Sequence, residues 1–430
     1  MTRFTALGDL LNTIIDRGVR LVDFSPDADG APVADLCADL LTSKGEASGR
    51  ALAHEILSRY AVLDEAERLV FFEALASRFN PDPQAVAQAA DAYAADPSAV
   101  PLAELFTSVE PPRQELLRRL NTAPDGTERL VAMRADLLPM LRDHPALAAI
   151  ETDFRHLLRS WFNRGFLVMR PINWSTPASV LEKIIAYEAV HQIDSWEELR
   201  RRVEPPDRRC FAFFHPAMPD EPLIFVEVAL TDQVPGSIQE VLAEDRSPVA
   251  AETAKTAVFY SISNCQAGLA GISFGAFLIK QVAHDLSQDL PGLETFVTLS
   301  PLPGFARWLS ADPVAEAALP VLSDKSWQTG GADDADAKAL LMPLAAHYLL
   351  TAKRDKNQPP DPVARFHLGN GAELHAIHWR ADTSEKGYAQ SAGIMVNYLY
   401  KLDKIEANHE VYTADGTIVA ARSVRQLAMA

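Results

Sequence analysis

Cysteine is scarce in this chain of 430 residues, which has Cys37, Cys210 and Cys265 and no CxxC pair. An odd and sparse set of cysteines fits a reducing compartment better than a disulfide framework. Long apolar runs are also missing, and none approaches the roughly 18–20 residues of a membrane span. Asp9 and Asp16 interrupt the first residues, so we expect neither a signal nor a transit peptide. These absences predict a cytoplasmic protein that does not bind membranes.

Positive charge is in short supply as well. The chain has 40 Lys and Arg against 58 Asp and Glu, and its formal net charge is −18. This balance argues against nucleic acid or an anionic membrane as the main partner, because both require a basic surface. Any anionic ligand must therefore meet donors that are concentrated locally. The length allows two domains, since a single core rarely grows beyond about 250–300 residues.

Several motifs of known chemistry are missing from the sequence. The glycines have neither the GxGxxG spacing of dinucleotide-binding folds nor the GxxxxGK[ST] spacing of P-loops, which disfavours nicotinamide and ATP chemistry. There is no HExxH, and no GxSxG elbow surrounds the serine considered below. His375 and His378 lie three residues apart in an expected strand, so their side chains should point to opposite faces. We therefore expect neither a metal nor an organic cofactor.

The first third of the chain has helical periodicity. From about residue 2 to residue 166 apolar residues recur at helical spacing, and little has strand character. Three apolar faces are formed by Leu7, Leu10, Leu11, Ile14 and Ile15, by Leu52, Ile56, Leu57 and Tyr60, and by Leu69, Phe71, Phe72, Leu75 and Phe79. We predict a helical bundle over residues 1–160 and a second domain over residues 161–430. The bundle is either self-contained or packs a further apolar face on a second subunit.

The second part is predicted to be mixed α/β. Residues 210–214 and 223–230 have the composition of a β-hairpin, and residues 372–379 and 394–400 of two closing strands. Residues 323–338 combine two glycines with several acids, so we predict a solvated, mobile insertion there, with a lid as the alternative.

A strand, a glycine-rich loop, a helix and a second strand follow one another in this part. Residues 256–263 and 295–299 are rich in β-branched and aromatic side chains, and residues 276–290 have an apolar face of helical period. Two strands joined by a helical crossover should be parallel neighbours. The loop and the end of the second strand should then meet at one edge of the sheet, where open α/β sheets bind ligands.

The loop between the first strand and the helix contains Gly268, Gly271 and Gly275. A glycine-rich turn that opens a helix presents unpaired backbone N–H groups and the positive end of the helix dipole to phosphate. The spacing alone is a weak signal, and a purely structural turn remains an alternative.

Two side chains stand out for their local context. Ser300 ends the second strand, and Pro301 restricts it to extended geometry. His367 lies in the last turn of a short helix that begins with Asp361 and a proline and ends at a Gly-Asn-Gly stop. Taken singly, each has a plain alternative: a serine that merely ends a strand, and a structural histidine.

These segments contain short sequence motifs that follow one another in a fixed order. They include Ser261-Ile262-Ser263, Gln266-Ala267-Gly268-Leu269-Ala270-Gly271, Leu299-Ser300-Pro301-Leu302-Pro303-Gly304-Phe305, Phe366-His367-Leu368-Gly369-Asn370-Gly371-Ala372 and Val396-Asn397-Tyr398-Leu399-Tyr400. Further motifs lie in the first part of the chain, at Arg129-Leu130-Val131, Met133-Arg134-Ala135-Asp136-Leu137-Leu138 and Trp161-Phe162-Asn163-Arg164-Gly165-Phe166-Leu167. In order and spacing the set resembles the malonyl-CoA decarboxylases over nearly the whole chain.

The resemblance implies a helical N-terminal domain used in self-association, as a dimer or tetramer, and a catalytic domain similar to the acyl-CoA N-acetyltransferase fold. It also implies a carboxy-lyase of fatty acid metabolism that converts malonyl-CoA to acetyl-CoA without a cofactor. Its catalytic pair falls on Ser300 and His367, with Tyr400 in support. The substrate contacts fall on Ala270, Gly271, Ile272, Ser273, Phe274, Gly275 and Ala276. Some relatives carry an acid where this chain has Ser273, so no charged role is assigned to that position.

The chemistry explains why so few residue types suffice. Loss of CO2 from a malonyl thioester leaves an enolate whose electron sink is the thioester carbonyl itself. The protein must align the breaking bond, stabilise the enolate oxygen and supply a proton to the α-carbon. His367 is expected to be the donor because the ordinary histidine pKa lies near neutrality. Two alternatives stay open: an acyl-CoA-dependent acyltransferase, and a non-catalytic protein that binds acyl-CoA.

Overall fold

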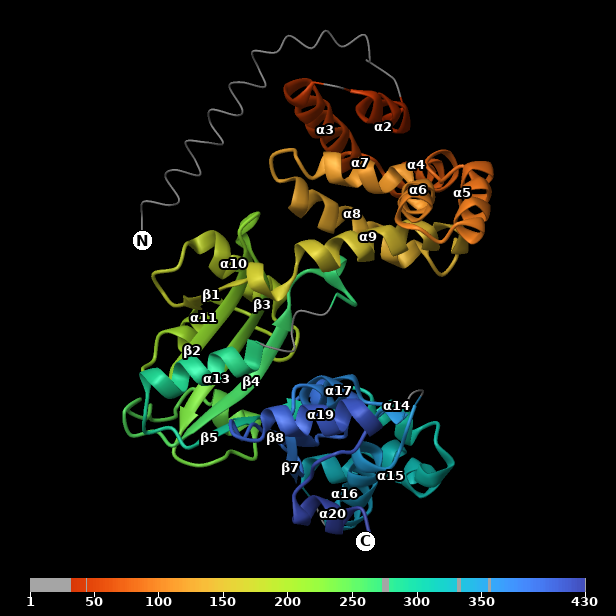
Figure 1. Ribbon diagram of the computed structural model, residues 1–430. Coiled ribbons are helices and arrows are strands. Elements are labelled where there is room, and N and C mark those ends of the chain that lie inside the picture. The colour runs from red at the N-terminus through yellow and green to blue at the C-terminus, as the bar shows by residue number, and fades with distance from the viewer. Residues whose placement is uncertain (1–31, 44, 273–277, 331–333, 355–356, 430) are drawn as a thin grey trace. The chain divides into compact units, whose positions relative to one another are not determined.

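The computed structural model describes residues 32–43, 45–272, 278–330, 334–354 and 357–429 (Figure 1). They form two compact units. The first contains the chain up to Phe166 together with residues 215–219 and 266–272, and the second contains the rest. The apolar face expected between Leu7 and Ile15 lies outside the described residues.

Helices build the first unit and run from red to yellow in Figure 1. They are α2 (Val33–Thr42), α3 (Glu46–Ala61), α4 (Glu65–Arg78), α5 (Pro83–Ala95), α6 (Ala99–Val109), α7 (Pro112–Leu120), α8 (Gly126–Met140) and α9 (Ala148–Trp161), with 3-10 turns η1 (Pro145–Leu147) and η2 (Arg164–Phe166). Local sequence sets several of their ends. Asp64 forms a capping box with Glu67 at the start of α4, and Pro83 opens α5 behind the cap Asp82.

A mixed sheet forms the centre of the second unit. Its strands are β1 (Val168–Ile172), β2 (Arg208–His215), β3 (Met218–Thr231), β4 (Thr256–Asn264), β5 (Thr295–Thr298), β6 (Ser300–Pro301), β7 (Glu373–His378) and β8 (Met395–Leu399). They are ordered β1-β2-β3-β4-β5-β8-β6, with β7 paired to β8. β4 and β5 are parallel, with Thr256 opposite Thr295, as the crossover predicted. The other strand pairs with a described register are antiparallel.

The helices of this unit are α10 (Ala178–Tyr187), α11 (Trp196–Val203), α12 (Ile238–Leu242), α13 (Leu278–Asp289), α14 (Phe305–Leu309), α15 (Leu319–Ser323), α16 (Asp334–Leu350), α17 (Pro362–Gly369), α18 (Glu385–Ser391), α19 (Ile405–Asp415) and α20 (Arg422–Leu427). In α13 the predicted apolar face is buried at Leu278, Val282 and Leu286. A helical first part followed by a mixed α/β part is therefore confirmed. No helix among the described residues is long and apolar enough to cross a membrane.

The prediction of a mobile loop over residues 323–338 is wrong for most of the described residues of that segment, and residues 331–333 lie outside the described residues. Residues Ser326–Thr329 form a 3-10 turn, η6, and α16 already begins at Asp334. Trp327 is buried, and its ring lies 5.3 Å from that of Trp379. The acids that suggested a solvated loop include Asp334 and Asp336, which occupy the first turn of α16, where the helix dipole favours negative charge.

Candidate active site

A cavity of about 250 Å³ opens within the second unit beside the end of β5. Its wall contains Ser300 and His367 among mostly apolar side chains. The apolar part is formed by Val190, Ile224, Phe259, Ile262, Pro301, Pro362, Val363 and Phe366. Among the described residues of this lining there is no Lys or Arg. The cavity is therefore a weakly polar space with one serine and one histidine in its wall.

Ser300 is held in a chain of hydrogen bonds. Its hydroxyl donates to Thr298 Oγ1 at 2.9 Å, and its Oγ lies 3.1 Å from His367 Nε2. Because the serine hydrogen is directed to Thr298, its oxygen can accept the Nε2 hydrogen of the imidazole. This arrangement requires the histidine tautomer that carries hydrogen on Nε2.

His367 reaches the cavity from the last turn of α17. Asp361 caps that helix by accepting from the backbone N–H groups of Val363 and Ala364, which fixes its start. His367 Nδ1 lies 2.8 Å from the Tyr400 hydroxyl, and its ring stacks on Tyr398 with centroids 4.5 Å apart. Burial raises the pKa of Tyr400, so this phenol keeps its hydrogen and donates it to Nδ1. The donated bond leaves the other hydrogen on Nε2, facing Ser300.

Burial also changes the expected charge of the histidine. His367 is 2% exposed, and this desolvation lowers its pKa from 6.5 to about 3. The expectation of an imidazole with a pKa near neutrality is therefore wrong. At neutral pH the ring is uncharged, and it acts through its N–H group rather than as an imidazolium.

Thr298 is a site residue that the sequence reasoning missed. Its Oγ1 also accepts from the backbone N–H of Tyr398, and its carbonyl accepts from Asn397 Nδ2 at 2.7 Å. These bonds tie Ser300 to β8. A signal was available, because residues two apart in an extended segment share a face, which places Thr298 beside Ser300.

The predicted substrate loop is described only in part. Ala270, Gly271 and Ile272 belong to the first unit, whereas Ser273, Phe274, Gly275 and Ala276 lie outside the described residues. Gly271 has φ +73°, a conformation that favours glycine. Substrate binding by this loop stays a prediction.

Arg134 on α8 holds the stem of that loop within the first unit. Its guanidinium makes a two-pronged pair with Glu151, both bonds 2.8 Å long, and donates to the carbonyls of Gly268 and Ala270. Gly268 lies so close to α8 that a side chain there would collide with the carbonyl of Val131. Sequence reasoning named Arg134 only within a motif of the family resemblance and did not predict this contact.

In the described part of the chain no group of three or more His, Cys, Asp or Glu side chains is placed to hold a metal ion. His378 Nε2 is instead hydrogen-bonded to Asn397 Oδ1.

Comparison with known proteins identifies the family. Residues 165–430 match the model of the malonyl-CoA decarboxylase C-terminal domain, and residues 79–162 match that of the N-terminal domain. The chain belongs to the malonyl-CoA decarboxylase family. The two matches span residues 79–162 and 165–430 and so reach into both units, and the family resemblance inferred from the sequence motifs is confirmed.

Solved malonyl-CoA decarboxylases are similar over their whole length. The enzyme from Rhodopseudomonas palustris is 52% identical with a TM-score of 0.88, covering 92% of this chain and 98% of that one. The enzyme from Agrobacterium vitis is 53% identical, also with a TM-score of 0.88, covering 92% of this chain and 99% of that one. The mitochondrial malonyl-CoA decarboxylase of Anser anser anser is 37% identical over 351 residues, which are 73% of this chain and 69% of the relative. Because that relative is mitochondrial, a cytoplasmic location for this chain stays a prediction.

Proposed function

We propose that this protein is a carboxy-lyase that converts malonyl-CoA to acetyl-CoA and CO2. The observation that carries the proposal is the hydrogen-bonded chain Ser300, His367 and Tyr400 in the wall of an apolar cavity, in a chain of this family. In the reaction the bond between the α-carbon and the carboxylate breaks, and its electron pair moves into the thioester carbonyl. The resulting enolate takes a proton at the α-carbon.

The apolar wall favours loss of CO2. A carboxylate in such surroundings has lost its water and meets no Lys or Arg from the described lining, whereas CO2 is neutral and loses little there. The charge moves to the thioester oxygen, where hydrogen-bond donors stabilise it. We propose that backbone N–H groups of the loop Ala270 to Ala276 bind the substrate, as the family resemblance implies.

Ser300 and His367 are proposed to deliver the proton as one unit. In that step the serine hydroxyl turns from Thr298 to the substrate and gives its hydrogen to the α-carbon, while it takes the Nε2 hydrogen of His367 and the ring takes the Tyr400 hydrogen at Nδ1. The negative charge left by the departing CO2 thus ends on the Tyr400 oxygen, and a proton from water restores the neutral chain. Tyr400 holds Nδ1 from the other side and keeps the ring in the required tautomer. No protein charge has to be created in the cavity before the substrate binds, because the imidazole is neutral.

Incubation of the purified protein with malonyl-CoA alone should give acetyl-CoA and CO2 in equal amounts, with no metal added. The thioester supplies the electron sink, so treatment with a chelator should leave the rate unchanged. The products are measured by chromatography and by CO2 release. An acyltransferase would need an acceptor, and a binding protein would give no product, so either outcome would contradict the proposal. Inhibition by the chelator that a divalent ion reverses would contradict the metal-free reaction.

We further propose that the helical unit mediates a homo-oligomer, a dimer or a tetramer. Apolar side chains are exposed on its helices: Val70 is 64% exposed on α4, and Val100 and Phe106 are 68% and 67% exposed on α6. Light scattering of the full chain at micromolar concentration should give a mass at least twice the 47.1 kDa of one chain. Phe106→Glu should lower that mass if α6 lies in the interface, with exposed Glu104→Gln as a control. A monomer at this concentration would rule out the proposal.

A further inference from the structure

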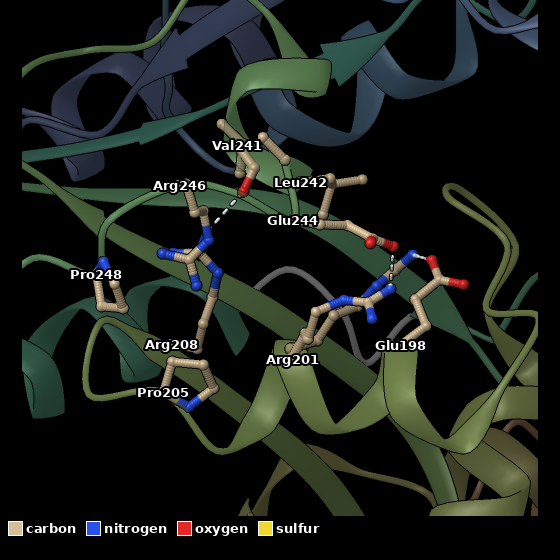
Figure 2. A pocket seen from close by; sticks show the side chains of 11 residues that line it. Glu198, Arg201, Pro205, Arg208, Val241, Leu242, Glu244, Arg246 and Pro248 are labelled. Atoms are coloured by element: carbon tan, nitrogen blue, oxygen red, sulfur yellow. Dashed lines mark hydrogen bonds and ion pairs between the residues drawn. The ribbon is translucent and has the colours of Figure 1, made fainter.

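A second hollow of about 320 Å³ lies in the second unit, between α11, the start of β2 and the segment after α12 (Figure 2). Four arginines line it: Arg201, Arg202, Arg208 and Arg246. In Figure 2 Arg208 and Arg246 lie on one side, and Arg201 lies with Glu198 and Glu244 on the other. Such a cluster is unexpected in a chain with a net charge of −18.

The hollow is separate from the Ser300 cavity. Leu230 at the end of β3 donates its backbone N–H to the carbonyl of Asp207, which precedes Arg208. That end of β3 pairs with Thr256, the first residue of β4, whereas Asn264 at the other end of β4 lines the Ser300 cavity. The residue of β4 in the cavity lining that is nearest to Thr256 is Phe259, three residues along the strand, or roughly 10 Å at 3.2–3.4 Å per residue. The two linings share no residue. The arginines therefore do not belong to the active-site cavity.

The carboxylates near the arginines do not balance them. Asp207 is shared, because one of its oxygens accepts from Arg208 at 3.2 Å and also from Arg246. Glu198 and Glu227 both pair with Arg202, but Glu227 is fully buried, and this desolvation raises its pKa to about 8. Neither Asp207 nor Glu227 lines the hollow itself.

The remaining pair is exposed and weak. Arg201 pairs with Glu244 at 2.7 Å, and the Glu244 side chain is 76% exposed. Pairs of this kind contribute about 0–1 kcal/mol, so Glu244 can be displaced by a competing anion at little cost. The lining of the hollow contains four guanidinium groups and two carboxylates, those of Glu198 and Glu244. Positive charge is therefore in excess in the lining.

We propose that this pocket binds a phosphate group. Guanidinium groups that approach from several directions match a tetrahedral anion, which presents oxygens on all sides, better than a planar carboxylate. Arg202 and Arg208 are only 4% exposed in their side chains, and bonds to backbone carbonyls fix their charges in place. Arg201 and Arg246, 36% and 18% exposed, present the donors that a ligand can reach. Pro205, Leu242 and Pro248 add apolar walls that can hold the organic part of a phosphomonoester.

Calorimetric titration of the full chain tests the site, with inorganic phosphate and adenosine 5′-monophosphate as probes at constant ionic strength and pH 7. We expect both to bind. Tighter binding of the nucleotide would assign the site to an organic phosphate, and equal affinities would assign it to the free ion. No binding of either probe at tens of millimolar would overturn the proposal.

Three variants locate the binding. Arg246→Gln removes a charge-assisted donor and should weaken phosphate binding by about tenfold or more. Glu244→Gln removes the competing carboxylate and should tighten binding several-fold, a gain that misfolding does not produce. Arg200→Gln removes an equal charge from the same helix outside the pocket, and its affinity should match that of the unmodified protein. Equal affinity in all three variants would place the phosphate elsewhere and overturn the assignment.

Discussion

Ser300→Ala and His367→Asn should each lower kcat for malonyl-CoA by about 10²–10⁴-fold, the usual contribution of a positioned proton donor or relay. Both side chains lie at the cavity proposed for the malonyl end of the substrate, so the affinity for acetyl-CoA should change little. Steady-state rates of acetyl-CoA formation give kcat, and calorimetric titration gives the affinity for acetyl-CoA. His284→Asn, on the exposed face of α13, is a matched control that should keep the normal rate. A nearly normal kcat in His367→Asn would remove histidine from the mechanism and leave Ser300 and Tyr400 to be tested.

The double variant tests whether the two residues act together. The 3.1 Å contact between Ser300 Oγ and His367 Nε2 makes each residue depend on the other. Removing both should therefore cost little more than the worse single change, because groups that act as a unit are not additive. Losses that multiply would show that serine and histidine have independent roles.

The pH profile gives a further check on the same pair. In the folded protein burial lowers the pKa of His367 to about 3, so the ring stays neutral as pH falls from 8 through the ordinary histidine range and takes a proton only in strong acid. Between about pH 5 and pH 8, no change in kcat should arise from this group. A limb near pH 6.5 that disappears in His367→Asn would show that the imidazole titrates as if it were exposed, and would contradict the neutral relay.

Arg134→Met should lower the free energy of unfolding by about 3–5 kcal/mol, because it leaves the buried carboxylate of Glu151 without its main partner. The same change removes the donor to the carbonyls of Gly268 and Ala270, so the loop stem loses its attachment to α8. If that loop binds substrate, KM for malonyl-CoA should rise as well. Denaturant unfolding measures the first effect, and steady-state kinetics on the remaining folded protein measures the second.

Two further variants separate these effects. Arg155 also pairs with Glu151, at 2.7 Å, but its side chain is 48% exposed, so Arg155→Met should cost less than about 1 kcal/mol. Adding Glu151→Met to Arg134→Met replaces the buried pair by apolar groups and should recover much of the lost stability. KM should stay high in that double variant, since the loop carbonyls still lack their donor. Equal destabilisation by Arg134→Met and Arg155→Met would show that the buried ion pair contributes no more to the free energy of unfolding than the exposed one.

The sequence by itself determined the features that depend on neighbours along the chain. Apolar spacing identified α13, the cap Asp361 and the following proline identified α17, and the crossover between residues 256 and 299 predicted that β4 and β5 are parallel. These features are local because caps, turn residues and periodicity act within a few residues. The order of the sequence motifs also identified the family, and the family resemblance named Ser300 and His367 as candidate catalytic residues.

Only the tertiary structure decided how those candidates are connected. Ser300 and His367 are 67 residues apart, and their contact depends on β6, β8 and α17 packing together. The low pKa of His367 follows from complete burial, which no local pattern specifies. The same reason applies to Arg134, whose partners Gly268 and Ala270 lie more than 130 residues away along the chain. It also applies to Trp327, which is buried in a segment that was predicted to be a solvated loop. Contacts between distant segments set the desolvation and the hydrogen-bond partners of a side chain, and a single sequence does not encode them locally.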